Sequence, residues 1–584
     1  MEPADSPKGR ECSQKRSPFD LIMNQIRRKK SFTDRRPKTS VGRFFRPTEN
    51  SDRKEGGFPG IREAEALRDE DRAGNGDPTD SEVSSAVGWG RVKQFVQKLG
   101  KKPDSQSLSL GHCDLTATDV LELATLLPFL SLLEEMDLSW NDLIGGSLRA
   151  LTFHLQHVSR LRSLRLSSCR LTADDLTALG EALDFIPLLE VVDLSWNSGV
   201  GGNLQCFTRG LRPGNRVKEL HLVECQLTAA DAEALAGALC LLPGLELLDL
   251  SVNRLLEGGL GELAPQLKGT PRLRVLRIHM CGLGRDSLQT LGSAFPFLLA
   301  LEHLDLSCNR GVSGGFAQVS AHLAQLTHLR SLDIHMCDLT EEDLQALVQV
   351  LPSLGDLTML DLSSNKKIGG VSHLLFPGLL LSKLKTLSLN NCCLTEQSYH
   401  SLANAVQSMG QLECLGLSWN KSVGGGLRLV LDALQADCPL RKLRLGSCGL
   451  NTEDLLYLAS AAKRGALAHL SHLDLMCNDG VGEQGWTHLF KEAGGLGSLT
   501  ELDISQRPSG PSSGHPPASP WLPGLLAALP RLPLLSRFSM RHWALTARDR
   551  DRLEAFNKDS KRNVHFDFDT WNTAGRREAG SSEN

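Results

Sequence analysis

Cysteine recurs along this chain every 56 residues, and it is the residue from which disulfides and zinc clusters are built. One interval in the series is 55 instead of 56. An asparagine recurs at the same period, out of step with the cysteines, with one interval of 55 and one of 58. The periodic residues are Cys113, Cys169, Cys225, Cys281, Cys337, Cys392 and Cys448, and Asn141, Asn197, Asn253, Asn309, Asn365, Asn420 and Asn478.

The spacing itself argues against both kinds of thiol chemistry. Each cysteine or asparagine ends a short strand-like phrase, as in Leu164–Cys169 and Val192–Asn197, so one period holds two strands. Equivalent cysteines then lie roughly 10 Å apart, whereas a disulfide needs α-carbons within about 7 Å. No four of them converge on one zinc ion. We expect these thiols to be buried at strand ends as small hydrophobic groups and weak hydrogen-bond donors.

A fixed period of this size predicts stacked units that bury their apolar sides against one another. Strand phrases recur about every 28 residues, at Leu108, Met136, Leu164, Val192, Leu220, Leu248, Leu276, Leu304, Leu332, Leu360, Leu387, Leu415, Leu443, Leu473, Leu502 and Phe538. A threonine with an acid three residues later, as in Thr172–Asp175, follows several cysteine phrases and marks the start of a helix. Glycine pairs such as Gly201-Gly202 follow the asparagine phrases and suit a tight crossing to an outer helix.

These signals divide the chain into four parts. Residues 105–570 are expected to form about 16 units, closed by a cap strand at 564–568. Residues 88–104 predict an amphipathic cap helix at the other end. Residues 1–87 and 571–584 are polar and predict disordered tails.

Charge and composition restrict the partners. Residues 1–50 hold thirteen Lys/Arg against six Asp/Glu, whereas residues 88–584 are nearly neutral, so no nucleic-acid groove is expected in the repeats. We see no apolar signal core at the N-terminus and no run long enough for a transmembrane segment. With fifteen cysteines and no disulfide pattern, the chain is expected in a reducing compartment, the cytoplasm or the nucleus.

The phrase Leu-x-Leu-x-x-Cys/Asn-x-Leu, in two alternating types with a helix each, resembles the ribonuclease-inhibitor-like class of leucine-rich repeats. The resemblance spans roughly residues 105–560. It implies an α/β horseshoe solenoid with a parallel concave β-sheet, convex helices and ligand binding on the concave face. The resemblance does not imply an enzymatic activity. No phosphate loop, dinucleotide fingerprint or Cys-x-x-Cys pair occurs, so we predict no catalytic residue, no cofactor and no metal.

On a concave sheet, the middle residue of each Leu-x-Leu phrase faces outward. Acid and base alternate in this column from Asp137 to Asp305, which favours cross-strand neutralisation. The alternation breaks where Asp305, Asp333 and Asp361 follow one another. On the next two strands, Ser388 and Gly416 remove side-chain bulk from the floor of the concave surface. An unneutralised acidic row can accept an Arg or Lys anchor from a partner. The partner-binding candidates are Asp305, Asp333, Asp361, His303, His335, Met336, Trp419, Trp140 and Trp196.

Each candidate has a plainer interpretation. The acids are common in such phrases and can simply be solvated, and a divalent ion on them is disfavoured because a flat sheet rarely encloses one. A tryptophan at a strand exit can pack under the next turn instead of contacting a partner. The pairs His279-Met280 and His335-Met336 are surface contacts or packing on the same reasoning.

The basic N-terminal segment places Ser31, Thr39 and Ser40 just after runs of Arg and Lys. This pattern fits nuclear import, contact of residues 15–46 with anionic membrane, or phosphorylation by a basophilic kinase, as well as a merely solvating tail. The Pro/Ser/Gly loop 507–523 is a further candidate contact. Two functions follow: a scaffold or inhibitor that binds another protein on the concave face, or an adaptor whose tail does the targeting.

Overall fold

A computed structural model describes residues 105–379, 383–421, 423–424, 426–508, 519 and 521–568. The chain divides into two compact units, Met1–Glu63 and Ala64–Asn584, and every described residue belongs to the second. The predicted cap helix, both tails, Ser31, Thr39, Ser40 and the membrane-contact segment lie outside the described residues. So do residues 509–518 and 520 of the loop 507–523.

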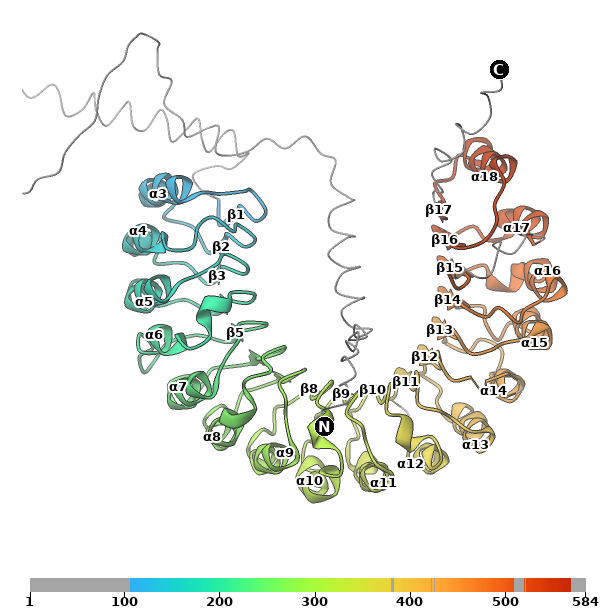
Figure 1. Cartoon of the computed structure of the whole chain (residues 1–584), viewed down its shortest axis with the longest axis horizontal. Helices are drawn as coiled ribbons and strands as arrows, with labels where there is room; N and C mark the ends of the chain where they lie inside the picture. The colour runs from blue at the N-terminus through green and yellow to red at the C-terminus, as the bar shows by residue number, and fades with distance from the viewer. Residues whose placement is uncertain are drawn as a thin grey trace, which may run out of the picture. The chain divides into compact units, whose positions relative to one another are not determined.

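Within the second unit, seventeen strands of the described residues form one parallel sheet, each paired with the next along the chain. The strands lie on the inside of the arc in Figure 1 and the helices on its outside. Their bounds are β1 Ser107–Ser109, β2 Glu135–Asp137, β3 Ser163–Arg165, β4 Val191–Asp193, β5 Glu219–His221, β6 Leu247–Asp249, β7 Val275–Arg277, β8 His303–Asp305, β9 Ser331–Asp333, β10 Met359–Asp361, β11 Thr386–Ser388, β12 Cys414–Gly416, β13 Lys442–Arg444, β14 His472–Asp474, β15 Glu501–Asp503, β16 Arg537–Ser539 and β17 His565–Asp567.

The horseshoe solenoid predicted from the sequence is therefore confirmed. Each of the sixteen leucine phrases supplies one strand, and the leucine-type residue is its buried centre. The register pairs these centres directly, as in Leu276 with Leu304. Because side chains alternate along a strand, the two flanking residues face away from the core onto the concave face.

The helices alternate in length with the two types of unit. Helices that follow the cysteine phrases are mostly longer, such as α5 with 10 residues, than those after the asparagine phrases, such as α6 with 5. Their bounds are α3 Ala117–Leu126, α4 Leu148–Phe153, α5 Ala173–Ala182, α6 Leu204–Thr208, α7 Ala229–Leu239, α8 Leu260–Gln266, α9 Arg285–Gly292, α10 Phe316–Leu323, α11 Glu341–Val350, α12 Leu375–Gly378, α13 Glu396–Val406, α14 Leu427–Ala433, α15 Thr452–Lys463, α16 Glu483–Lys491, α17 Leu522–Ala528 and α18 Ala547–Ser560.

The threonine–acid pairs start the longer helices, as the sequence predicts. Thr172 and Asp175 form a capping box at the start of α5. The buried Asp175 carboxylate also accepts hydrogen bonds from the backbone N–H of Gly146 (2.6 Å) and of Leu148 (2.9 Å), at the start of α4. One acid thus satisfies donors at the N-termini of two neighbouring helices, which ties successive units together.

The periodic asparagines and cysteines join consecutive units through the backbone. The Asn197 side chain accepts from the N–H groups of Cys169 and Leu171 and donates to the carbonyls of Leu166 and Leu194, at 2.8–3.1 Å. The Cys169 thiol donates to the carbonyl of Leu138 at 3.2 Å. All fourteen cysteines of the described residues are free thiols, and burial raises the pKa of Cys169 to about 12. The predicted role as buried weak donors is confirmed for six of the seven periodic thiols, whereas Cys113 is half-buried.

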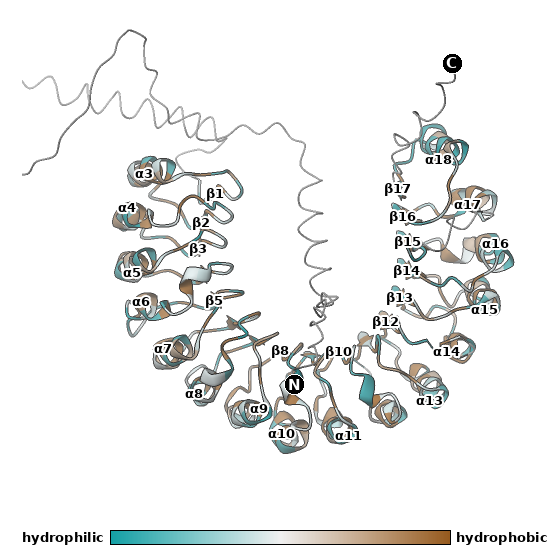
Figure 2. Cartoon of the chain, viewed as in Figure 1, coloured by the Kyte–Doolittle hydropathy of each residue, from teal (hydrophilic) through white to brown (hydrophobic). Residues whose placement is uncertain are grey.

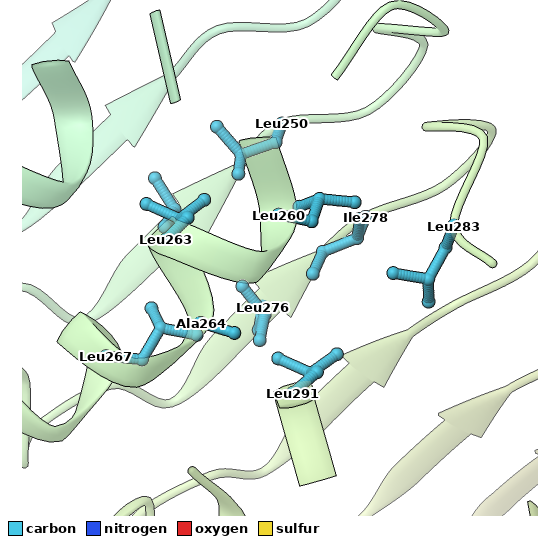
Figure 3. A pocket seen from close by; sticks show the side chains of 10 residues that line it. Leu250, Leu260, Leu263, Ala264, Leu267, Leu276, Ile278, Leu283 and Leu291 are labelled. Atoms are coloured by element: carbon cyan, nitrogen blue, oxygen red, sulfur yellow. The ribbon is translucent and has the colours of Figure 1, made fainter. Parts of the chain in front are cut away.

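The core lies between the sheet and the helices. Figure 2 shows helices that carry both hydrophilic and hydrophobic residues, as expected when one side is buried. Figure 3 shows part of this core, where Leu263 and Leu267 of α8, Leu276 of β7 and Leu291 of α9 face one space. All ten residues around that space are aliphatic. None of the helices in the described residues is long and apolar enough to cross a membrane.

Candidate protein-binding face

Opposite charges alternate across the concave face, as the sequence predicts, and they form ion pairs. In the column two residues before each strand centre, Arg162 contacts Glu134 (3.4 Å) and Glu190 (2.7 Å). Further along, Glu302 is shared by Arg274 (2.7 Å) and Arg330 (3.4 Å). We call this arrangement the charge ladder. Because it is internally paired, it leaves little net attraction for a partner.

The aspartates in the column after each strand centre also have a local structural role. The Oδ1 atom of Asp305 accepts the backbone N–H of Ser307, two residues later, at 3.0 Å. Asp361 does the same for Ser363 at 2.9 Å. An aspartate at this position therefore stabilises the exit of its own strand, which explains why the residue recurs.

What distinguishes Asp305, Asp333 and Asp361 is that they follow one another on three adjacent strands, with no basic residue between them in this column. Asp249, two strands earlier, pairs through its Oδ2 with Arg277 at 3.2 Å. For the three consecutive acids, the described residues provide no lysine or arginine partner, and the only ion pair is between Asp333 and His335. Burial, with the neighbouring Asp333, raises the pKa of Asp361. The structure thus brings the three acids together on β8, β9 and β10 in direct register.

The floor beside the acids differs from the expectation. Gly416 was expected to leave a low polar floor, but the space above it is occupied by the Asn390 side chain, which a Cβ would meet at 2.9 Å. Asn390 is held there because it accepts the N–H of Ser418 (2.9 Å) and donates to Ser363 (3.1 Å). Ser388 is buried. The acids therefore end against a side-chain amide and not against a hollow.

A cluster of two histidines and a cysteine adjoins the acids. The Cys308 Sγ lies 3.3 Å from the Nε2 of His335, and the Nδ1 of His335 contacts the Asp333 carboxylate at 2.8 Å. His279 lies on the other side, with its ring 5.8 Å from that of His335. Burial alone raises the pKa of the Cys308 thiol, but hydrogen bonds to the two histidines lower it to about 7. Burial lowers the pKa of His335, and its contacts with Asp333 and Cys308 more than offset this and raise it.

His335 and Met336 are among the partner-binding candidates predicted from the sequence, whereas Cys308 is not. Cys308 precedes the periodic Asn309, outside the cysteine column, and its neighbours come from the preceding and following units. The Met336 sulfur lies 3.9 Å from the Cys308 sulfur. His303 is exposed on β8, outside this cluster, and partial burial and nearby arginines lower its pKa.

The tryptophans form an aromatic row near the N-terminal end of the sheet. Trp140 stacks on His112 with ring centres 5.3 Å apart, and Trp196 lies 6.2 Å from Trp140. Both tryptophans are half-buried and have positive φ angles, of 63° and 64°, which turn the chain sharply at the strand exit. Trp419 occupies the same position in a later unit, is 54% exposed and takes no part in this row. The row is thus partly packing and partly accessible surface.

Comparison with known proteins places this geometry in a family. A leucine-rich-repeat family model matches residues 325–348. The chain is 31% identical to the ribonuclease inhibitor of Sus scrofa over 332 residues, which cover 55% of this chain and 71% of that protein. The chain belongs to the ribonuclease-inhibitor-like family of leucine-rich-repeat proteins.

Other relatives agree with this family. The ribonuclease inhibitor of Mus musculus is 29% identical over 404 residues, covering 68% of this chain and 87% of that protein. The human NACHT, LRR and PYD domains-containing protein 12 is 32% identical, over 54% of this chain but only 30% of its own length. Among solved structures, one of the Rad7 and Elc1 complex in yeast covers 75% of this chain and 94% of its own, with 16% identity and a TM-score of 0.39, too low to bear on function.

Proposed function

We propose that this protein is a scaffold or inhibitor that binds another protein on its concave face, with the three acids of β8, β9 and β10 as the anchor site. The observation that carries the proposal is the run of three adjacent acids in the column after each strand centre. Asp249 in the same column pairs with a cross-strand arginine, but Asp305, Asp333 and Asp361 have no Lys or Arg partner among the described residues. A partner that presents an Arg or Lys side chain would supply the missing charge.

Two further features support this choice of face. The relatives that cover most of their own length are named as inhibitors of another protein, a ribonuclease, and the same repeat architecture is present here. The aromatic row of His112, Trp140 and Trp196 adds an exposed histidine and two half-buried tryptophans at strand exits, and tryptophan is among the residues that dominate binding energy at protein interfaces. The partner is thus expected to be a protein with exposed basic side chains.

The test is a charge reversal on an otherwise unchanged chain. Partners are recovered by proximity labelling and mass spectrometry from the full chain, from Asp333→Lys/Asp361→Lys and from the matched reversal Asp474→Lys/Asp503→Lys. The control pair lies in the same column on β14 and β15 and changes the net charge equally. We expect partners that depend on the first pair and persist with the second. Equal recovery from all three chains would exclude the acids as the anchor site.

Deleting residues 1–87 separates this function from the alternative of a targeting adaptor. A scaffold that binds through its repeats keeps its partners after the deletion. Loss of every partner with the tail, together with no effect of the reversal, would instead favour an adaptor in which the tail carries the targeting.

A further inference from the structure

We infer that the exits of β7, β8 and β9 form a site for one soft divalent metal ion, preferentially Zn²⁺, bound by His279, Cys308 and His335. These residues come from three consecutive units, and one ligand atom of each lies within 4.8 Å of the others. The inference rests on their geometry and does not depend on the proposed partner.

The spacing of the ligand atoms suits a tetrahedral ion. Bond lengths of about 2.0 Å for nitrogen and 2.3 Å for sulfur place the ligand atoms of a tetrahedral zinc roughly 3.3–3.8 Å apart. The Cys308 Sγ and His335 Nε2 are 3.3 Å apart already. The three ligand atoms all lie within 4.8 Å of one another. Side-chain rotations that move these atoms by up to about 1 Å would bring them to bonding distance of one ion.

Neighbouring residues fix both imidazoles in the form that a metal needs. The Nδ1 of His335 lies 2.8 Å from Asp333 Oδ1, and an ionised carboxylate only accepts, so this nitrogen carries the hydrogen. The Nδ1 of His279 lies 2.7 Å from the Ser307 hydroxyl, whose own hydrogen is donated to Asp305. Ser307 therefore accepts from His279. In both rings the Nε2 atom is then the nitrogen left for the ion, which would displace any proton that Nε2 shares with the Cys308 thiol.

This arrangement is the one usually found behind histidine ligands of zinc, where a carboxylate or another acceptor holds the second ring nitrogen. Here one histidine is held directly by Asp333, and the other is held by Asp305 through Ser307. Without a metal, the Cys308 sulfur and the His335 Nε2 share a hydrogen bond at 3.3 Å. A metal ion would replace the shared proton, which is released to solvent as the metal–sulfur bond forms.

The donor types select the kind of ion. Two imidazoles and a thiolate are borderline to soft ligands that favour zinc over magnesium or calcium. The Met336 thioether, 3.9 Å from the Cys308 sulfur, adds a further soft donor nearby. Asp333, His335 and Asp361 form a second possible group, but it shares His335 with the first and would have to break the contact that orients that ring. One site, not two, is therefore expected.

Three protein ligands leave one coordination position for water or for a group of another molecule. All three ligand residues are half-buried, so the position is reachable from solvent. The chain also offers a matched control. Cys477 occupies the equivalent place before Asn478 and is half-buried like Cys308, but the adjacent units place Gly446 and Ser505 where the histidines would be.

The experiment is a titration of the metal-free full chain with Co²⁺, whose spectrum reports both tetrahedral geometry and bonding to sulfur. We expect a thiolate-to-cobalt charge-transfer band and visible bands that saturate at one equivalent and disappear when Zn²⁺ is added. The charge-transfer band should vanish in Cys308→Ser and persist in Cys477→Ser. In Ser307→Ala, where all three ligands remain but the Nδ1 of His279 loses its partner, affinity should fall by about 10-fold.

The alternative is a cluster held by protons and hydrogen bonds only. Absence of a saturable band in the wild-type chain, or a band that survives in Cys308→Ser, would overturn the metal site. The urea midpoint of each variant is measured beside the titration. Ser307→Ala keeps all three ligands, so a changed affinity at an unchanged midpoint separates metal binding from folding.

Discussion

At the residue scale, asparagine and cysteine occupy equivalent positions in alternate units but satisfy different numbers of backbone groups. Asn253 accepts from the N–H groups of Cys225 and Leu227 and donates to the carbonyls of Leu222 and Leu250, at 2.6–3.1 Å. The Cys225 thiol makes only weak contacts, with the carbonyl of Leu194 in the preceding unit at 3.3 Å and with that of Val223 at 3.6 Å. Both residues therefore join two units, but the asparagine satisfies many more backbone groups than the cysteine does.

We predict that Asn253→Ala is far more destabilising than Cys225→Ala. The alanine at 253 leaves two N–H groups and two carbonyls buried without that partner, which should lower the free energy of unfolding by about 3–5 kcal/mol, against about 1 kcal/mol for the thiol. Urea unfolding measures the difference, and hydrogen exchange at Cys225 and Leu227 shows whether it is local. Equal losses in the two variants would contradict this account.

At this scale, some side-chain contacts could be predicted from the sequence and others could not. The roles of Asn253 and Cys225 follow from their periods, because the same contacts recur in every second unit. His279 and His335 lie 56 residues apart, but Cys308 belongs to neither periodic series, and the meeting of the three residues depends on the register of three strands and on the turns after them. A search for histidines 29 residues before and 27 residues after a non-periodic cysteine would have indicated them. The filling of the space above Gly416 by Asn390 depends on side-chain packing that no pattern reveals.

At the element scale, the lengths and positions of strands were predictable because each carries one buried centre between two outward residues. The helices were predictable where a threonine and an acid begin them, as in α5. The protonation of acids on neighbouring strands was harder to predict. The sequence shows which residues are adjacent on the concave face but not how deeply each one is buried. Strands β14 and β15 are an example, since their register places Asp474 directly beside Asp503.

This strand pair should make stability depend on pH. Burial, with the adjacent Asp503, raises the pKa of Asp474 to about 6 in the folded chain, against about 3.9 for an unperturbed aspartate. Between these values the folded state binds more protons than the unfolded state, so the free energy of unfolding falls as the pH rises from about 4 to about 6. The ionised Asp474 thus costs on the order of 2–3 kcal/mol at pH 7.

Asp474→Asn removes this charge and retains an oxygen that can accept the N–H of Met476. We expect the variant to be more stable than the wild-type chain at pH 7 and to lose the advantage at pH 4, where the aspartate is already protonated. Urea midpoints at the two pH values measure the difference, with Asp174→Asn, an exposed residue in the first turn of α5, as control. A gain that is the same at both pH values would rule out ionisation as its cause.

At the scale of the whole molecule, a stack of units needs a cap at each end, because a terminal unit exposes the apolar surface that every other unit buries. At the C-terminal end, β17 pairs with β16, and Asp567 of β17 binds both Arg541 (2.7 Å) and Arg537 (3.5 Å). These arginines keep the pKa of the Asp567 carboxyl low although burial would raise it. Behind them, Phe538 packs against Trp521 and Phe566 with ring centres 6.1 and 6.5 Å apart.

Removing β17 should therefore open the end of the solenoid. We compare a chain that ends at Ser560 with one that ends at Phe568, so that both lack the residues after 568 and only the first lacks the strand. Loss of β17 unpairs the edge of β16 and uncovers Phe538, so we expect red-shifted tryptophan fluorescence, stronger binding of an apolar dye and a lower melting temperature. Because neighbouring units support one another, the loss should extend into α17 and α16 before it reaches the middle of the sheet, as hydrogen exchange would show. Identical spectra and melting temperatures for the two chains would mean that the solenoid ends stably at β16 without a cap.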